Sequence, residues 1–154
     1  MLFALKVIVV LVLLVLVAFA GLSAWSRVSP PSLGLNEGGL RACPSSPNCV
    51  SSQAEQAGKQ VLPIDYLGDR AATEAALRSA SKGLGLASQS EDGNYWHYLA
   101  TSKIFRFLDD VEFVFDDANS VVHVRSASRS GYSDRGVNSA RVEALRTAMS
   151  AAGS

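Results

Sequence analysis

The stretch VHVRSASRSGYSDRGVNSAR, which ends at Arg141, combines residue types that hold an anion or form ion pairs. It contains Arg125 and Arg129, several serines, Asp134 and Asn138. Guanidinium groups, hydroxyls and the N–H groups at the start of a helix bind phosphate or carboxylate, so one hypothesis is an anion site. The alternative hypothesis is that the arginines pair with acidic residues and only fix the positions of strands and helices.

Two histidines, His97 and His123, are the candidates for acid–base catalysis, but the sequence positions no partner beside either one. The chain lacks the nucleophile elbow of serine hydrolases, a lysine-containing phosphate loop and the helical zinc motif of metalloproteases. We therefore assign no catalytic residue, and whether the protein is an enzyme stays open. The sequence identifies no cofactor. Its histidines and cysteines do not stand at the spacing of a metal site, so no metal is predicted.

The elements that position these residues begin with a strand predicted from Asp110 to Phe115. Apolar and acidic side chains alternate along it, which is the pattern of a strand with one buried face. Val111, Phe113 and Phe115 share one face, and the acidic residues at 110 and 112 share the other.

A turn at 116–120 leads into a partner strand over 121–128. A slip of one residue would bury the wrong side chains, and a two-residue turn at 118–119 or a four-residue turn over 117–120 gives one and the same register. Its opposing pairs are Phe115 with Val122, Phe113 with Val124, and Glu112 with Arg125. Asp110 then lies diagonal to Arg125, and Arg129 projects to the same side if the strand continues. The predicted polar site comprises Arg125, Arg129, Glu112, Asp110 and His97, followed by Asp134, Asn138 and Arg141.

The side chains that follow the second strand indicate how the segment before the final helix folds. Asp134 is expected to bond to nearby N–H groups or to an arginine, either Arg129 or Arg141. Asn138 is expected to cap the final helix, which begins near Val137 or Asn138.

The remaining elements follow from caps, turns and periodicity. Asp69 is a good N-cap for a helix over 70–83. Further strands are predicted over 60–64, 84–89 and 95–101, with a hairpin turn at 91–94 and a connection over 101–108. This order indicates an α+β domain, an antiparallel β-sheet covered on one face by two helices. The other face of the sheet is expected to be solvated or to form a binding surface.

An apolar segment opens the chain. From Val7 to Leu22 no residue is charged, and with its flanks the run approaches the roughly 20 residues of a transmembrane helix. Two interpretations remain, a transmembrane anchor over 1–25 and a signal peptide cleaved after the small-residue pattern ending at Ala20. Lys6 precedes the run, which favours a cytoplasmic N-terminus. Both interpretations place residues 43–151, the predicted domain, outside the cytoplasm, after a linker over 26–42 rich in serine, proline and glycine.

The two cysteines agree with export. Cys43 and Cys49 lie in RACPSSPNCVSS, whose prolines and serines favour turns that bring the two ends together. In an oxidising compartment a disulfide is the expected outcome, and closing so small a ring stabilises by about 2 kcal/mol. A redox pair and a metal site are the alternatives, but five residues separate the cysteines instead of the usual two.

Size and charge limit the possible partners. The 154 residues provide for one domain beyond the apolar segment. The 14 basic and 14 acidic residues give no net charge, so nucleic acid is not an expected partner.

Three stretches, CPSSPNCVSS, LDDVEFVF and VHVRSASRSGYSDRGVNSARVEAL, resemble the bacterial and plastid family called domain of unknown function 1499. The resemblance covers roughly residues 33–148. It implies a family often preceded by a membrane segment and gives no established function. Ser139 stands where a basic residue is expected. The positions that match the family pattern are Cys43, Cys49, Asp109, Asp110, Glu112, Arg125, Ser126, Ser128, Arg129, Tyr132, Asp134, Gly136, Asn138 and Arg141.

Three functional hypotheses follow. The first is a non-enzymatic periplasmic module on the inner membrane, which binds an envelope protein or a small anionic ligand through the charged sheet face. The second is an enzyme that clamps an anionic envelope substrate with Arg125 and Arg129, with Glu112, Asp134 or His97 as acid or base. The third is a cofactor or lipid carrier with a cavity lined by Tyr95, Trp96 and Tyr98.

Overall fold

The computed structural model describes residues 1–29 and 32–152. Three helices are present in this part of the chain: α1 (Leu2–Val28), α2 (Arg70–Gly83) and α3 (Val137–Ala152). The long strands are β5 (Ala87–Asp92), β6 (Tyr95–Thr101), β7 (Leu108–Asp116) and β8 (Val121–Ser128). The short strands are β1 (Leu35–Asn36), β2 (Gly39–Leu40), β3 (Cys49–Ser51) and β4 (Ile64–Asp65).

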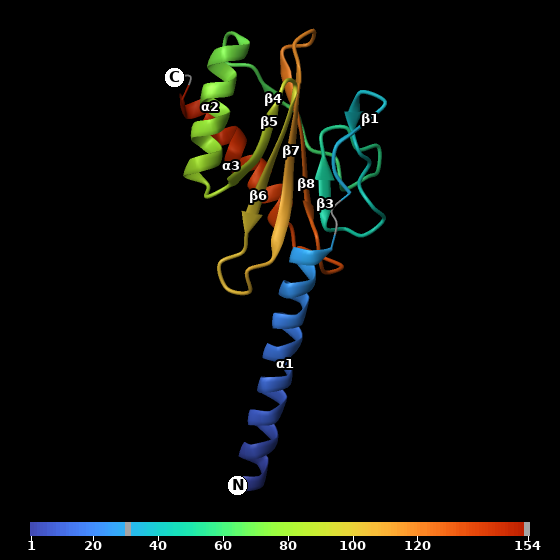
Figure 1. Cartoon of the computed structure of the whole chain (residues 1–154), viewed down its shortest axis with the longest axis vertical. Coiled ribbons are helices and arrows are strands. Elements are labelled where there is room, and N and C mark those ends of the chain that lie inside the picture. Colours follow the sequence, from blue (N-terminus) through green and yellow to red (C-terminus); the bar gives the residue numbers. More distant parts are fainter. Residues whose placement is uncertain (30–31, 153–154) are drawn as a thin grey trace.

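The main sheet is antiparallel, with strand order β3-β8-β7-β6-β5, and β4 also pairs with β8. Helices α2 and α3 lie together on one face of it (Figure 1). This confirms the predicted α+β fold with an antiparallel sheet and two covering helices. The core between the layers contains Trp96, Phe113 and Phe115 from the sheet and Leu77 and Leu145 from the helices, all buried.

The register predicted for β7 and β8 is confirmed. Phe115 pairs with Val122, Phe113 with Val124, and Glu112 with Arg125. The helix expected over 70–83 is also confirmed, and the carboxylate of Asp69 accepts a hydrogen bond from the Ala72 N–H as its N-cap.

Two strands differ from their predicted positions. The strand expected over 84–89 lies at 87–92 instead, because only Gly93 and Asn94 are needed for the hairpin turn, with Gly93 at a positive φ of 52°. The strand expected over 60–64 is mostly irregular, and only β4 at its end pairs with β8. Pro63 precedes β4 and has no N–H to donate to a neighbouring strand.

The sheet face away from the helices was expected to be solvated or to form a binding surface. It is not solvated, because another part of the chain covers it. Strands β1 and β2 form a small hairpin whose second strand contacts both β7 and β8. Figure 1 shows β1 on the opposite side of the sheet from α2 and α3. The stretch expected to be a linker, 26–42, thus holds the last turn of α1 and this hairpin. Consequently the charged residues on this face of β7 and β8 lie between the sheet and the β1–β2 hairpin.

Helix α1 projects from the end of the sheet at which β6 joins β7 (Figure 1). With 27 residues and a mainly apolar composition it is long and apolar enough to cross a membrane, a criterion that a signal sequence also meets. Its C-terminal part contacts the domain, where the rings of Phe19 and Phe105 stack with centroids 4.2 Å apart.

Candidate functional site

The centre of the predicted polar face is the ion pair between Glu112 and Arg125, which face each other across β7 and β8. The side chain of Glu112 is fully buried, and both of its oxygens are used. Oε2 accepts from Nη1 of Arg125, whereas Oε1 accepts from the Tyr95 hydroxyl and the Gly34 N–H, each at 2.8 Å. Burial, followed by the charge of Glu112, raises the pKa of the Tyr95 hydroxyl, which therefore remains a proton donor.

A second pair lies beside it on the same face. Arg129 donates two hydrogen bonds to Asp110, from Nε to Oδ2 at 2.8 Å and from Nη2 to Oδ1 at 2.7 Å. Oδ1 also lies 2.8 Å from Nε2 of His97, and since an ionised carboxylate only accepts, this histidine nitrogen carries the hydrogen. Burial alone would raise the pKa of Asp110, but the bonds from His97 and Arg129 outweigh it and hold the pKa below its usual value.

A third pair stands on the helix side of the sheet. Arg141 of α3 donates from Nη2 to Asp109 at 2.6 Å and from Nη1 to the Ser126 hydroxyl at 2.8 Å. Asn138 is fully buried beside it, and its amide accepts from Ser126 and Arg141 and donates to the Ser128 hydroxyl and the Asn48 carbonyl. All four hydrogen-bonding positions of this amide are therefore filled.

The prediction that Asn138 caps the final helix is wrong, because its side chain bonds inside the domain. Asp134 has that role, and its carboxylate accepts from the N–H groups of Gly136 and Asn138 at 3.1 and 2.7 Å. Of the two alternatives given for Asp134, bonding to local N–H groups is the one observed. Arg129 and Arg141 instead bind Asp110 and Asp109.

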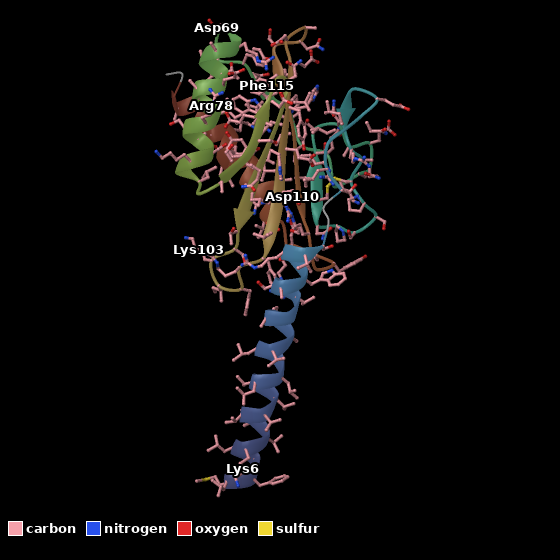
Figure 2. The ribbon with its side chains drawn as sticks, viewed as in Figure 1. Lys6, Asp69, Arg78, Lys103, Asp110 and Phe115 are labelled. Carbon is pink, nitrogen blue, oxygen red and sulfur yellow. A yellow bond between two sulfur atoms is a disulfide. The ribbon has the colours of Figure 1, made fainter. Side chains whose placement is uncertain are left out.

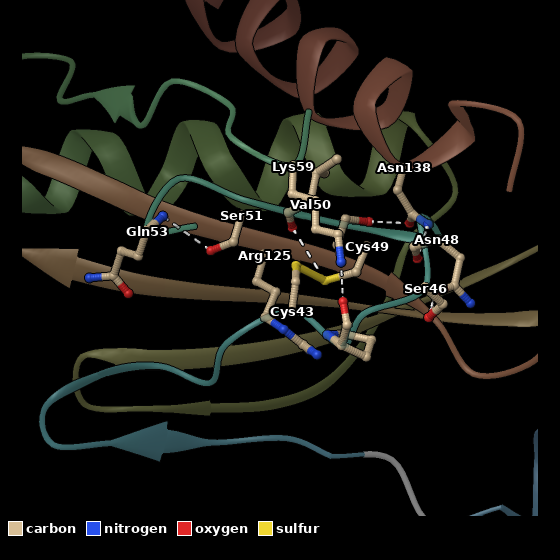
Figure 3. Close-up of a disulfide and its surroundings, with 12 residues drawn as sticks. Cys43, Ser46, Asn48, Cys49, Val50, Ser51, Gln53, Lys59, Arg125 and Asn138 are labelled. Carbon is tan, nitrogen blue, oxygen red and sulfur yellow. Dashed lines mark hydrogen bonds between the residues drawn. A yellow bond between two sulfur atoms is a disulfide. The ribbon is translucent and has the colours of Figure 1, made fainter. Parts of the chain in front are cut away.

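The disulfide between Cys43 and Cys49 is confirmed, with the two Cα atoms 5.7 Å apart. It closes a loop whose last residue before the bridge, Asn48, contacts the segment between β8 and α3. Asn48 donates from Nδ2 to the Gly131 carbonyl at 2.7 Å, and its own carbonyl accepts from Asn138 (Figure 3). Sequence reasoning missed Asn48, because nothing in its neighbourhood indicates a contact 90 residues away.

These contacts bring the predicted site residues together as an internal network. The arginines at 125, 129 and 141 each bind a carboxylate of β7, and all three pairs are largely buried. Nε of Arg125 is buried without a hydrogen-bond partner in the described structure. The arrangement can fix the strands, the hairpin and α3 relative to one another, but it presents no free arginine clamp to a ligand. Among the described residues, no group of three or more His, Cys, Asp or Glu side chains is placed to hold a metal ion.

The aromatic residues of β6 do not line a shared cavity. Trp96 and Tyr98 are buried in the core under the helices, whereas Tyr95 points to the opposite face and binds Glu112. The carrier hypothesis in its predicted form is therefore wrong.

A pocket of about 240 Å³ lies instead where α1 meets the end of the sheet. Its apolar lining comes from Phe19 and Leu22 of α1, together with Phe107 and Val137. Its polar lining comes from serines and two carboxylates: Ser102, Ser128, Ser130, Ser133, Asp109 and Asp134. Of these, only Asp134 was a predicted site residue. The others come together through contacts between α1, the β6–β7 loop and the β8–α3 loop, which no local pattern indicates.

Fold and site define a class of protein: a small α+β domain with ion pairs buried on both faces of its sheet, preceded by an apolar helix of membrane-spanning length. Residues 39–149 match the model of a family described as a protein of unknown function, DUF1499. The match covers well over half of the chain, so the protein belongs to the DUF1499 family, as the three sequence stretches predicted. A search of curated proteins found no match.

Proposed function

We propose that the chain is a single-pass protein of the bacterial inner membrane, with its domain in the periplasm, and that it is a binding module, not an enzyme. The length and composition of α1 support the anchor, and Lys6 before the apolar run supports a cytoplasmic N-terminus. The disulfide supports an oxidising compartment for the domain.

The charged sheet face has a structural role in this proposal. A clamp for an anionic substrate needs unpaired arginines, but Arg125 and Arg129 already bind Glu112 and Asp110. Admitting an anion would separate buried opposite charges, which is strongly unfavourable. The buried charges thus hold the hairpin and the sheet together, and binding takes place elsewhere.

We assign binding to the pocket between α1 and the domain, and the composition of its lining carries this proposal. One side is apolar and belongs partly to the anchor helix, whereas the other side has hydroxyls and two carboxylates. Asp134 occupies the N–H groups at the start of α3, so an anion is excluded there. The lining offers more acceptors than donors, which favours a ligand head group bearing an amine or hydroxyls.

The position of the pocket favours a ligand that resides in the membrane. Phe19 and Leu22 belong to the last part of the apolar run, so the pocket opens at the outer boundary of the bilayer that α1 would cross. Its 240 Å³ lies below the usual range of about 300–1,000 Å³ for sites that enclose a whole ligand. It therefore suits the head group and first carbons of an amphiphile whose chains remain in the bilayer.

The test uses the full chain in lipid nanodiscs that contain a lipid with a primary-amine head group, and native mass spectrometry counts the retained lipid. Ser130 lines the pocket, so Ser130→Phe fills it and is expected to weaken retention roughly tenfold, the effect of losing about 1.4 kcal/mol. Ser90→Phe, at an exposed position of β5, is the matched control and should retain lipid as the unchanged protein does. Equal retention by both variants, or preference for an anionic head group, would overturn the assignment.

A further inference from the structure

The β6–β7 loop, residues 102–107, exposes apolar side chains at the end of the domain where α1 emerges. Ile104 is 82% exposed and Phe105 is 36% exposed. Lys103 and Arg106 flank them and are also exposed. Figure 2 labels Lys103 in this loop, beside the outer end of α1. Two adjacent apolar side chains between two cations are the composition of a segment that lies at a membrane surface.

Contacts with α1 fix the position of this loop along the helix axis. Phe105 stacks on Phe19, and the carbonyl of Arg106 accepts from the Ser23 hydroxyl at 3.4 Å and from Nη2 of Arg27 at 3.2 Å. The loop is therefore held against the helix and does not project freely into solvent.

The same contacts set its depth in a bilayer. The apolar run ends at Leu22, so Phe19 lies three residues inside it, about 4.5 Å at the rise of a helix. A ring stacked on Phe19 therefore reaches the boundary between acyl chains and head groups. Trp25 and Tyr132 are also strongly exposed, and Tyr132 belongs to the β8–α3 loop by its sequence position. Figure 1 shows that loop at this end of the domain. Aromatic residues of this kind are enriched at membrane interfaces.

We propose that the β6–β7 loop is a second membrane contact, which binds the lipid surface of the outer leaflet of the membrane that α1 crosses. Ile104 and Phe105 insert among the lipid glycerol groups, and Lys103 and Arg106 contact the phosphates. The two contacts together hold the domain at a fixed tilt, with the pocket opening onto the bilayer. This inference rests on the proposed anchoring by α1 and is independent of ligand binding in the pocket.

A lipid surface is the occupant that the geometry favours over a partner protein. The loop contacts the end of the apolar run of α1, which the proposed anchoring places in the bilayer. Lipid is therefore already next to the loop, whereas a partner protein would have to displace it. The cations at 103 and 106 also complement lipid phosphates at that depth.

The experiment places one fluorophore on the full chain in nanodiscs of mixed zwitterionic and anionic lipids. Both native cysteines are in the disulfide, so an introduced cysteine is the single free thiol. Ile104→Cys is labelled with a polarity-sensitive dye, and quenching by lipids that carry a spin label near the glycerol is compared with quenching by aqueous iodide. Ala118→Cys is the control, because it is exposed in the β7–β8 turn at the other end of the nine-residue β7, roughly 30 Å away.

The label at 104 is expected to show blue-shifted emission, strong quenching by the spin-labelled lipid and at least threefold weaker quenching by iodide than the label at 118. Equal iodide quenching at both positions, with no lipid quenching at 104, would overturn the proposal. Leu14→Cys, within α1, separates this result from a failure of the anchor. If position 14 is quenched by lipid and position 104 is not, the anchor stands and the loop contact is refuted. If neither is quenched, the anchor itself is wrong.

Discussion

At the scale of single residues, the structure depends on charges that are buried and matched. Glu112 has no exposure to solvent, yet each of its oxygens accepts from a donor on β6, β8 or the segment before β1. Removing two ions from water costs several kcal/mol each, and only close pairing with further hydrogen bonds offsets it. Such a pair adds little net stability, but removing one partner strongly lowers the free energy of unfolding, because the other charge stays buried without a partner.

Arg125→Ala is therefore expected to lower the free energy of unfolding by about 3–5 kcal/mol, because it leaves Glu112 charged, buried and without its partner. Urea titration of the full chain in detergent, followed by tryptophan fluorescence, measures the change. Arg41→Ala, which removes an exposed arginine, is the control and should alter stability by less than about 0.5 kcal/mol. A variant at 125 as stable as the control would show that the pair has no structural role.

Asp110 makes the free energy of unfolding depend on pH in the acidic range. Its folded pKa is lowered, so the stabilisation is complete above the unfolded value of about 4 and is lost as the pH falls through the folded pKa. Asp110→Asn should be less stable than the unchanged protein at pH 7, and this difference should shrink as the pH falls below about 4. Unfolding midpoints from pH 7 to pH 2.5 test this, with the exposed Asp92→Asn as control. A difference that stays constant with pH would contradict it.

The pairing of site residues was predictable from sequence, whereas their burial was not. Side chains alternate strictly along a strand, so the apolar sets of β7 and β8, together with the short turn between them, place Glu112 opposite Arg125. What covers these residues is the hairpin at 35–40, which contacts β7 about 70 residues later in the chain. A two-residue strand has no periodicity to detect, and the Gly34 N–H that binds Glu112 carries no side-chain signal.

At the scale of elements, the disulfide loop fastens the edge of the sheet to the start of α3. Cys49 belongs to β3, which pairs with the end of β8, and Asn48 beside it bonds to the β8–α3 loop and to Asn138. The loop thus links three elements that the chain brings together only on folding. The turn-forming residues between the cysteines and the expected export predicted the bridge, but these docking contacts depend on the assembled fold.

Replacing both cysteines by serine, Cys43→Ser with Cys49→Ser, is expected to lower the free energy of unfolding by about 2 kcal/mol, the chain-entropy contribution of so short a loop. The same urea titration measures it. Adding reductant to the unchanged protein should reproduce the loss, and the double variant should not respond to reductant. A double variant that matches the oxidised protein would show that the Asn48 contacts alone hold the loop.

At the scale of the whole molecule, α1 and the domain share contacts instead of being joined by a free tether. Phe19, Ser23 and Arg27 each contact the β6–β7 loop, and Phe19 and Leu22 form one wall of the pocket. Cleavage after Ala20 would remove Phe19 and leave only Leu22 of that wall. The proposed binding site therefore requires an uncleaved anchor.

An uncleaved anchor makes a prediction about the intact chain. Protein purified from membranes should have the mass of all 154 residues and resist extraction by alkaline carbonate. Leu13→Arg places a charge near the middle of the span, where the cost of insertion is about 2.5–3.5 kcal/mol, and should move much of the protein to the extracted fraction. Leu62→Arg, at a strongly exposed position of the domain, is the matched control and should stay with the membrane. A mass that lacks the first 20 residues would instead mean that the segment is a signal peptide, and of its two α1 side chains the pocket would then lose Phe19 and keep only Leu22.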